Sequence, residues 1–494
     1  MATQAWKTDL GFLKQPLRML IDGEWVAAKR TISTLDPSNG EKLADIPEGD
    51  ADAINAAVSA ARRAFENGPW RTMAPAERAR LLWRLADLIE ENAEELCLID
   101  SLDNGKPMGE LRMVDLPLTI GIFRYYAGWC DKFGGETVPN SVPGMFTYTL
   151  REPVGVVGAI IPWNFPLLMC AYKLGPSLAT GNTIVLKPAE QTSLSALRLG
   201  ELIDEAGFPR GVVNIVPGLG EVAGAALAAH TGVDKVSFTG ETTTGREVVK
   251  GSTSNLKRVT LELGGKAPNI IFADADKEAA LAGAFGGIFF NQGQCCVAGS
   301  RLFVERPLHE EIAEQLSASA ANIKLGPGLT PGTEMGPLVS EEQLSRVLGY
   351  VEVAEKEGAR VATGGKRANG DLARGYFVQP TVLTNVTNEM RVAQEEIFGP
   401  VVAIIPFDDA EEMVKQANTT QYGLTAGIWT RDIARAHRVA AELRCGTVWI
   451  NTYGMFDPSV SFGGYKMSGY GRELGQASLD AYTQVKSVWV NVGT

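Results

Sequence analysis

Apolar runs and amphipathic helical patterns alternate between residues 154 and 272. The runs are VGAIIP, TIVLKP, VVNIVPG, KVSFTG and RVTLELGG, and the helical patterns between them include SALRLGELIDEAG and GEVAGAALAAH. Short apolar strands joined by helices are typical of a parallel sheet with helices on both faces. Ligands of such sheets bind at the carboxyl ends of the strands, so the residues that follow these runs are the first to consider.

The region before this one predicts a different mixture of elements. Residues 17–50 read as short strands and turns, and two long helical patterns follow. In the second pattern, apolar residues recur on one helical face, namely Leu81, Leu85, Leu88 and Ile89. This spacing predicts a helix that packs one side against a core.

A second α/β region extends from about residue 273 to 479. Its helical patterns are HEEIAEQLSASAANIKLG and SEEQLSRVLGYVEVAEKEG, and its clearest strands are VVAIIPF and CGTVWIN. A chain of 494 residues is too long for one ordinary core. We therefore expect two or three domains of the α/β class.

A ribbon-like stretch separates the early helical region from the first α/β region. Between residues 136 and 153, Phe146, Tyr148 and Leu150 alternate with polar residues, which predicts an exposed hairpin. The run QVKSVWVNV at 484–492 alternates like an edge strand and could pair with this ribbon, in the same chain or in a neighbour. An oligomer contact and an ordinary surface hairpin are both open.

Composition narrows the function classes. Lys and Arg number 46 against 58 Asp and Glu, a net charge of −12, and such a surface repels nucleic acid. Six cysteines and three scattered histidines show neither metal-site spacing nor a disulfide framework, so we expect no metal and a reducing, cytoplasmic setting. The start MATQAWKTDL resembles no signal peptide. Prolines and Asn164 interrupt the longest apolar stretch, 154–172, which argues against a membrane helix.

The stretch FFNQGQCCVAGSR at 289–301 is the first candidate for chemistry. It places Cys295 and Cys296 among glycines and carboxamides, which leave space around a sulfur and could supply amide donors and dipoles for a bound acyl group. A thiolate nucleophile needs such surroundings if an oxyanion is to be stabilised beside it. Two adjacent cysteines can equally be small buried core residues.

Several polar residues follow the predicted strands. Asn164 comes after AIIP, a Lys187–Glu190 pair follows TIVL, and a loop bounded by Gly240 and Gly245 follows KVSF and opens a helix. Such a loop could bind a phosphate, although a plain turn explains it equally well. A carboxylate stands inside the apolar strand of LELGGK, at Glu262, where it is either partnered in a structural salt bridge or faces a cleft.

Together these pieces resemble the NAD(P)-dependent aldehyde dehydrogenases along nearly the whole chain. The matching motifs, in order, are PWNFP, KPAEQT, FTGETTTG, LELGGK, FFNQGQCC, EEIFGP and FGGYKMSGYGRELG. The resemblance implies a Rossmann-like parallel-sheet domain that binds NAD, a second α/β catalytic domain and a small β oligomerisation arm. Their expected ranges are 1–135 with 154–264, 265–479, and 136–153 with 480–494.

The resemblance also implies roles for individual residues. Cys296 would be the nucleophile, Asn164 and the Cys296 amide the oxyanion hole, and Glu262 the general base, with Lys173 and Glu473 assisting proton release. The implied cofactor contacts are Ile161, Pro162, Trp163, Lys187, Glu190, Gly220, Gly240, Glu241, Gly245, Leu263, Glu396 and Phe398. The implied substrate tunnel is lined by Phe165, Met169, Tyr172, Phe290, Cys295, Phe456 and Phe462.

These roles predict oxidation of an aldehyde to a carboxylic acid with NAD and water. Glu190 should repel the 2′-phosphate of NADP, which makes NADP the less favoured cofactor. Glu241 stands where the family commonly has serine, and the direction of its effect is open. An apolar tunnel without Lys or Arg favours medium aliphatic or aromatic aldehydes. The alternatives are a cofactor-independent thiol esterase and a non-catalytic protein with the same fold. We also expect a homo-oligomer, with a tetramer as the expected form. We expect no nucleic-acid partner and no membrane partner.

Overall fold

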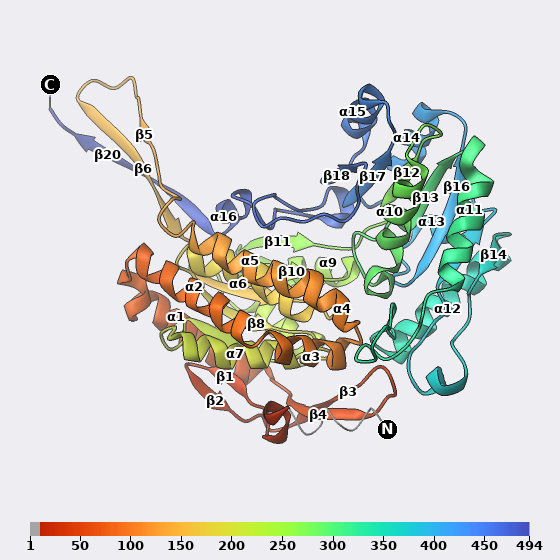
Figure 1. The fold of residues 1–494 in the computed structure, drawn as a ribbon. Coiled ribbons are helices and arrows are strands. Elements are labelled where there is room, and N and C mark those ends of the chain that lie inside the picture. Colours follow the sequence, from red (N-terminus) through yellow and green to blue (C-terminus); the bar gives the residue numbers. More distant parts are fainter. Residues whose placement is uncertain (1–9, 494) are drawn as a thin grey trace.

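The computed structural model describes residues 10–493. Residues 1–9 and Thr494 lie outside the described part of the chain. The prediction about a signal peptide rests on residues 1–9 and so is not tested by the structure. Figure 1 shows two α/β bodies side by side and a ribbon that extends away from them. No helix within residues 10–493 combines the length and the apolar character that a membrane span requires.

The first body is built on an eight-stranded sheet in the order β19-β11-β10-β7-β8-β9-β1-β2. The five central strands are parallel, and the edge strands β19, β1 and β2 run antiparallel to their neighbours. The predicted apolar runs form the five central strands: β7 (Val156–Ile160), β8 (Thr183–Lys187), β9 (Val213–Ile215), β10 (Lys235–Thr239) and β11 (Arg258–Glu262). The edge strands are β1 (Met19–Ile21), β2 (Glu24–Val26) and β19 (Gly469–Tyr470).

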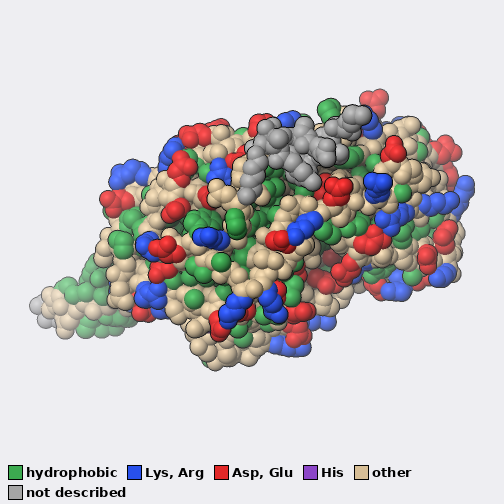
Figure 2. All heavy atoms as spheres, turned by 90° about the horizontal axis from the view of Figure 1, so that it is seen from below, with side chains coloured by type: hydrophobic (Ala, Val, Ile, Leu, Met, Phe, Trp, Pro, Cys, Tyr) green, Lys and Arg blue, Asp and Glu red, His purple; other side chains and the backbone are tan. Residues whose placement is uncertain are grey.

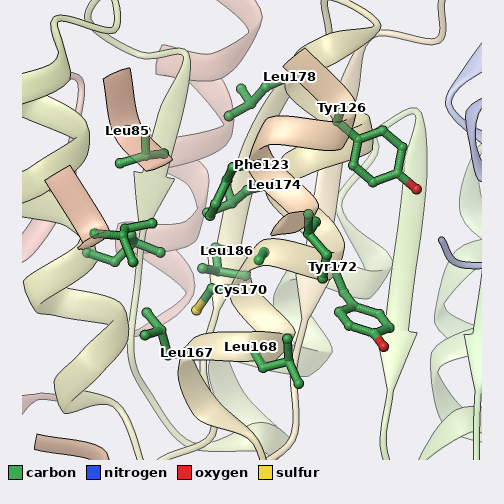
Figure 3. Packing of buried hydrophobic residues seen from close by; sticks show 14 of the residues in the cluster. Leu85, Phe123, Tyr126, Leu167, Leu168, Cys170, Tyr172, Leu174, Leu178 and Leu186 are labelled. Atoms are coloured by element: carbon green, nitrogen blue, oxygen red, sulfur yellow. The ribbon is translucent and has the colours of Figure 1, made fainter. Parts of the chain in front are cut away.

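Helices cover both faces of this sheet because successive strand residues point to opposite sides. Side chains such as Val156 and Val236 pack against α1 (Ala51–Asn67), α8 (Ala225–Ala229) and α9 (Thr242–Gly251). Val157 and Leu186 face the opposite helices, which are α2 (Pro75–Glu91), α3 (Ala93–Asn104), α5 (Leu116–Ala127), α6 (Pro166–Ala179) and α7 (Leu194–Ala206). Figure 3 shows this second layer, with Leu85, Phe123, Leu174 and Leu186 meeting in its core.

The predicted apolar face of α2 is largely correct. Leu85, Leu88 and Ile89 are buried, but Leu81 is only half-buried and its neighbour Leu82 lies in the core instead. The cause is the width of the contact surface, because α2 packs between α5 and α7 and so buries more than one narrow stripe.

The second body contains a seven-stranded sheet in the order β14-β15-β16-β13-β12-β17-β18. Its strands are β14 (Arg360–Thr363), β15 (Thr381–Thr384), β16 (Val401–Phe407), β13 (Arg301–Glu305), β12 (Pro268–Ile271), β17 (Thr425–Trp429) and β18 (Thr447–Ile450). Its main helices are α10 (Lys277–Phe289), α11 (Arg306–Ala321), α12 (Glu341–Lys356), α14 (Ala410–Asn418) and α15 (Ile433–Glu442). All strand pairs except β14 with β15 are parallel, so the α/β class is confirmed for both bodies.

The ribbon is a three-stranded sheet in the order β20-β6-β5. The long strand β6 (Met145–Pro153) pairs along its whole length with β20 (Thr483–Asn491), whereas β5 (Thr137–Val138) is only two residues long. The late strand therefore pairs with the ribbon of its own chain. Apolar side chains remain exposed on this ribbon, among them Phe146, Leu150, Val485 and Trp489.

Candidate active site

The loop that carries the two adjacent cysteines begins with an unusual turn. After α10 ends, Asn291 and Gln292 have positive φ angles of 49° and 56°, and Gly293 follows with 68°. Left-handed backbone is costly for residues other than glycine, so Asn291 and Gln292 require support from their surroundings. At Gly293 a side chain is also excluded, because an added Cβ would lie 2.2 Å from the Gly399 carbonyl oxygen.

The carboxamides of this loop supply that support. The Asn291 side-chain amide donates to the carbonyl oxygens of Asn164 (2.8 Å) and Gln294 (3.2 Å). The Gln294 side chain accepts from the Val339 amide (3.0 Å), and the Gln292 side chain donates to the Pro337 carbonyl (3.0 Å). The expectation that these carboxamides serve a bound acyl group is therefore wrong, because all three side chains are buried and hold backbone.

Asn164 lies between β7 and α6, opposite the cysteine loop. Its side chain is 5% exposed and borders a cavity, and its amide donates one hydrogen bond to the Gln294 carbonyl oxygen (2.9 Å). An amide nitrogen carries two hydrogens. The bond to Gln294 thus orients the group and leaves the second N–H for a ligand in the cavity.

Glu262 ends β11 and borders the same cavity. Its two carboxylate oxygens are buried and reach no hydrogen-bond donor at ordinary distance within the described chain. Burial, and then the nearby carboxylate of Glu473, raise the pKa of Glu262 well above its usual value. The alternative of a structural salt bridge does not apply, since Glu262 has no ion-pair partner among residues 10–493. A perturbed carboxyl group in a cleft is typical of acid–base chemistry.

Lys173 and Glu473 form a buried ion pair behind Glu262. The Lys173 ammonium also donates to the Thr239 hydroxyl (2.7 Å), and Glu473 borders the cavity. Lys173 lowers the pKa of Glu262 while Glu473 raises it. The proton affinity of Glu262 therefore depends on the state of this pair.

The two thiols are in contact with each other. The hydrogen bond with the Cys295 thiol, followed by burial, raises the pKa of Cys296, and the carboxylates of Glu396 and Glu262 act in the same direction. The same thiol–thiol contact lowers the pKa of Cys295. Because the two groups share one proton network, Cys296 in this state is a thiol that needs a base or a nearby positive charge to become a thiolate.

The cavity has a volume of about 300 Å³. Four residues with predicted chemical roles lie together in its wall: the nucleophile Cys296, the oxyanion donor Asn164, the base Glu262 and the proton-release residue Glu473. All seven predicted tunnel residues line the same wall. Those seven are Phe165, Met169, Tyr172, Phe290, Cys295, Phe456 and Phe462. Lys173 does not line it. Within the described chain no Lys or Arg borders the cavity.

Other wall residues were not singled out from the sequence, including Val114, Leu118, Leu168 and Tyr453. Tyr453 donates its hydroxyl to the Val297 carbonyl (2.7 Å), next to the cysteine pair. Its position shortly after β18 was an available signal, because functional residues gather behind parallel strands. The two residues from α5 and the segment before it carried no such signal.

A second group of predicted residues lies along the ends of the first sheet. The Lys187 ammonium is buried and 3.0 Å from a Glu190 carboxylate oxygen, and burial lowers the pKa of Lys187. The Lys187 carbonyl oxygen accepts from the Ile161 amide (3.1 Å). Trp163 packs edge-on against Phe398, with 5.3 Å between ring centroids, so this group spans both bodies of the protein.

The remaining predicted contacts surround the start of α9 and the strand ends near it. Glu241 precedes the helix but its side chain makes no cap, so the amides of the first turn are free of a side-chain acceptor. An added Cβ at Gly245 would meet Leu263 at 2.8 Å. Pro162, Gly240 and Leu263 border the cavity. Gly220 opens a separate short helical turn, Gly220–Gly224, with open space around it.

Glu396 connects this group to the cysteine loop. Its carboxylate accepts from the Gly265 amide (2.8 Å), and burial raises the pKa of Glu396 to about 7. A Cβ added at Gly264 would lie 2.1 Å from a Glu396 carboxylate oxygen, and one added at Gly265 would lie 2.2 Å from the Cys296 carbonyl oxygen. The two glycines therefore allow the strand end, Glu396 and the nucleophile loop to approach one another.

Comparison with known proteins shows what the chain as a whole resembles. The model of the aldehyde dehydrogenase family matches residues 25–488. The human mitochondrial aldehyde dehydrogenase is 52% identical over 96% of this chain and 92% of its own length. An aldehyde dehydrogenase of Bacillus cereus, solved as its NAD+ complex, is 54% identical with a TM-score of 0.96 over 99% of both chains. The betaine aldehyde dehydrogenase of Staphylococcus aureus, also with NAD+, is 41% identical with a TM-score of 0.97 over 99% of this chain and 98% of that one. With a family model that covers almost the whole sequence, the chain belongs to the aldehyde dehydrogenase family.

Proposed function

We propose that this protein oxidises apolar aldehydes, medium aliphatic or aromatic, to carboxylic acids with NAD+ and water. The observation that carries the proposal is the single cavity in which Cys296, Asn164 and Glu262 meet beside an apolar wall. A nucleophile, an oxyanion donor and a base are the three groups that acyl chemistry at a thiol requires.

The ends of the first sheet fit a dinucleotide. The uncapped first turn of α9 offers amide donors for a phosphate, and the carboxylates of Glu190 and Glu396 can accept from ribose hydroxyls. Bound NAD+ would accept a hydride from the substrate carbon. The solved relative from Bacillus cereus is an NAD+ complex, which supports the same choice here.

The protein's own residues then act in sequence. Glu262 accepts the thiol proton as the Cys296 sulfur adds to the aldehyde carbon, and the free N–H of Asn164 with the Cys296 amide stabilises the oxyanion of the resulting thiohemiacetal. Glu262 then releases this proton with the help of the Lys173–Glu473 pair. After oxidation a thioester on Cys296 remains. Glu262 removes a proton from the water that hydrolyses this thioester, and the Lys173–Glu473 pair behind it adjusts the proton affinity of Glu262.

The division of labour within the chain follows from this assignment. Residues 1–135 and 154–264 would bind the cofactor, 265–479 would carry the nucleophile, and 136–153 with 480–494 would form the oligomerisation arm. Support for the arm comes from the apolar side chains that remain exposed on the β5-β6-β20 ribbon. We propose that the protein is a homotetramer and that it is located in the cytoplasm. Light scattering should give the mass of four chains.

Cofactor preference gives one test. With a single aldehyde, kcat/KM should favour NAD+ over NADP+ by at least about tenfold, since a 2′-phosphate would meet the Glu190 carboxylate. Glu190→Gln keeps the hydrogen-bond acceptor and removes the charge, so it should narrow the ratio. A wild-type ratio that favours NADP+ would contradict the assignment.

Substrate preference gives a second test. Benzaldehyde, phenylacetaldehyde and hexanal should all exceed succinic semialdehyde in kcat/KM, because the described cavity wall is mostly apolar and offers no Lys or Arg side chain to a carboxylate. NADH absorbance reports each rate. The reverse order would exclude the apolar-aldehyde assignment while leaving aldehyde oxidation itself intact.

The two alternatives are separated by the same assay. A cofactor-independent esterase would hydrolyse an activated ester but form no NADH from aldehyde and NAD+. A non-catalytic protein would do neither. The three assembled groups favour an enzyme over a non-catalytic protein. The sheet ends that fit a dinucleotide, and the NAD+ complexes of solved relatives, favour the dehydrogenase over the esterase.

A further inference from the structure

A carboxyl group outside the cavity wall contacts the nucleophile loop. Glu110 ends the short helix α4 (Met108–Glu110), and a π-helical turn, Leu111–Asp115, follows it. One Glu110 carboxyl oxygen accepts the backbone amide of Asn291 at 3.0 Å. Asn291 is the first of the three left-handed residues that precede the cysteines, so this bond acts where the backbone is most strained.

Asn291 in turn connects the two halves of the predicted oxyanion hole. Its side-chain amide donates to the Asn164 carbonyl and to the Gln294 carbonyl, and Asn164 donates to that same Gln294 carbonyl. Gln294 lies two residues before Cys296. An anchor on the Asn291 backbone therefore fixes both the oxyanion donor and the loop that carries the nucleophile.

The charges around Glu110 explain its state. Lys106 is fully buried, but its ammonium already pairs with Asp115 and lies 3.7 Å from the centroid of the Phe165 ring. No ion-pair partner is left for Glu110 within residues 10–493. Burial raises the pKa of Glu110 to about 8. Lys106 and the hydrogen bond from the Asn291 amide oppose this shift, whereas Asp115 and Cys295 reinforce it. The raised pKa favours the protonated carboxyl group, and in either protonation state a Glu110 oxygen can accept the Asn291 amide.

We propose that Glu110 is a positioning residue for the reaction: by accepting the Asn291 amide it holds the left-handed turn that places Asn164 and Cys296. It touches neither substrate nor cofactor in this assignment, and the inference rests on the proposed roles of those two residues. Its chemical requirement is a hydrogen-bond acceptor at that position. A glutamine side chain has nearly the same shape and meets this requirement.

Two substitutions separate the hydrogen bond from the bulk of the side chain. Glu110→Ala removes the acceptor and should lower kcat/KM about tenfold, since misplaced reacting groups are costly even when binding persists. Glu110→Gln retains a neutral acceptor and should stay within about twofold of wild type at neutral pH. Both are measured with one aldehyde and NAD+, with NADH binding measured in parallel to show that the cofactor site is unchanged.

A matched control lies in the same segment. Glu94→Ala breaks the ion pair between Glu94 and Arg112, which joins the π-helical turn to α3, without touching Asn291. It should leave kcat/KM near wild type. An equal loss in Glu94→Ala and Glu110→Ala, or a Glu110→Gln variant as poor as Glu110→Ala, would overturn the proposal. Inactive wild-type protein would instead contradict the proposed function itself.

The pH dependence of the thiol alkylation rate gives a further test, because a loss of stability alone would not change this dependence. Above pH 8 the wild-type Glu110 ionises and adds a negative charge near Cys295, with Lys106 and Asp115 as the other charged groups around it. The alkylation rate of the cysteine pair should then rise less steeply in wild type than in Glu110→Gln between about pH 7 and 9. Identical profiles in the two proteins would show that Glu110 does not ionise beside the cysteine pair in this range, whereas an equal change in Glu94→Ala would overturn the special role of Glu110.

Discussion

Cys296→Ala should abolish NADH formation from aldehyde and NAD+, while Cys295→Ala should retain much of it. Both thiols border the cavity and contact each other, so proximity alone does not separate them. What separates them is the set of charged groups with the largest effect on each thiol: Glu396 and Glu262 act on Cys296, whereas Lys106 and Asp115 act on Cys295. Cys296 is therefore the thiol that the predicted base and the cofactor-side carboxylate influence most.

The measurement is a steady-state NADH assay with an unfolding curve for each variant. Each substitution removes one thiol from similar surroundings, so each variant controls for the effect of the other on packing. Cys295→Ala also removes the contact that raises the pKa of Cys296, and alkylation of its remaining thiol should therefore reach half its maximal rate at lower pH than in wild type. Equal activity of the two variants would show that the nucleophile is misassigned.

Asn164→Ala should lower kcat by about 10²–10³, equivalent to about 3–4 kcal/mol of transition-state stabilisation. The substitution removes the amide N–H that faces the cavity. It also removes the donor to the Gln294 carbonyl, so part of the loss comes from a less ordered loop. KM for the aldehyde should change less than kcat, because an oxyanion donor contributes mainly in the transition state.

Asn164→Asp is the comparison that isolates the donor. The aspartate occupies the same volume but in its ionised form offers no N–H and places a negative charge beside the developing oxyanion. It should be at least as poor as Asn164→Ala. Activity near wild type in either variant would remove Asn164 from the oxyanion hole, whereas a loss of NADH binding in both would assign it to the cofactor site.

Much of the fold could be predicted because strong periodic patterns coincide with buried elements. The apolar runs that form β7 and β8 are fully buried parallel strands, and β10 is buried except at Thr239. Short contiguous apolar segments favour such strands. The strand β19 could not be predicted in the same way. It has two residues, Gly469 and Tyr470, and exists only because β11 offers an open edge.

The candidate site shows the same division. Glu262 was conspicuous because a carboxylate in an apolar strand is rare, and the cysteine loop because of its glycines. The supporting contacts were not visible, since they depend on where distant backbone lies. The buried roles of Asn291, Gln292 and Gln294, and the contact from Glu110, arise from tertiary packing that local sequence does not encode.

The antiparallel pairing of β19 with β11 affects when the protein becomes chemically competent during its synthesis. Glu262 pairs with Gly469, the Leu263 amide donates to Ser468, and the segment that follows brings in Glu473. During synthesis, the loop that carries Cys295 and Cys296 is therefore completed more than a hundred and fifty residues before Gly469 and Glu473, the late neighbours of Glu262. Until then the nascent chain carries both cysteines without the strand pairing that brings Glu473 near Glu262. On the proposed assignment, thioester hydrolysis would therefore await the addition of this last segment to the first sheet.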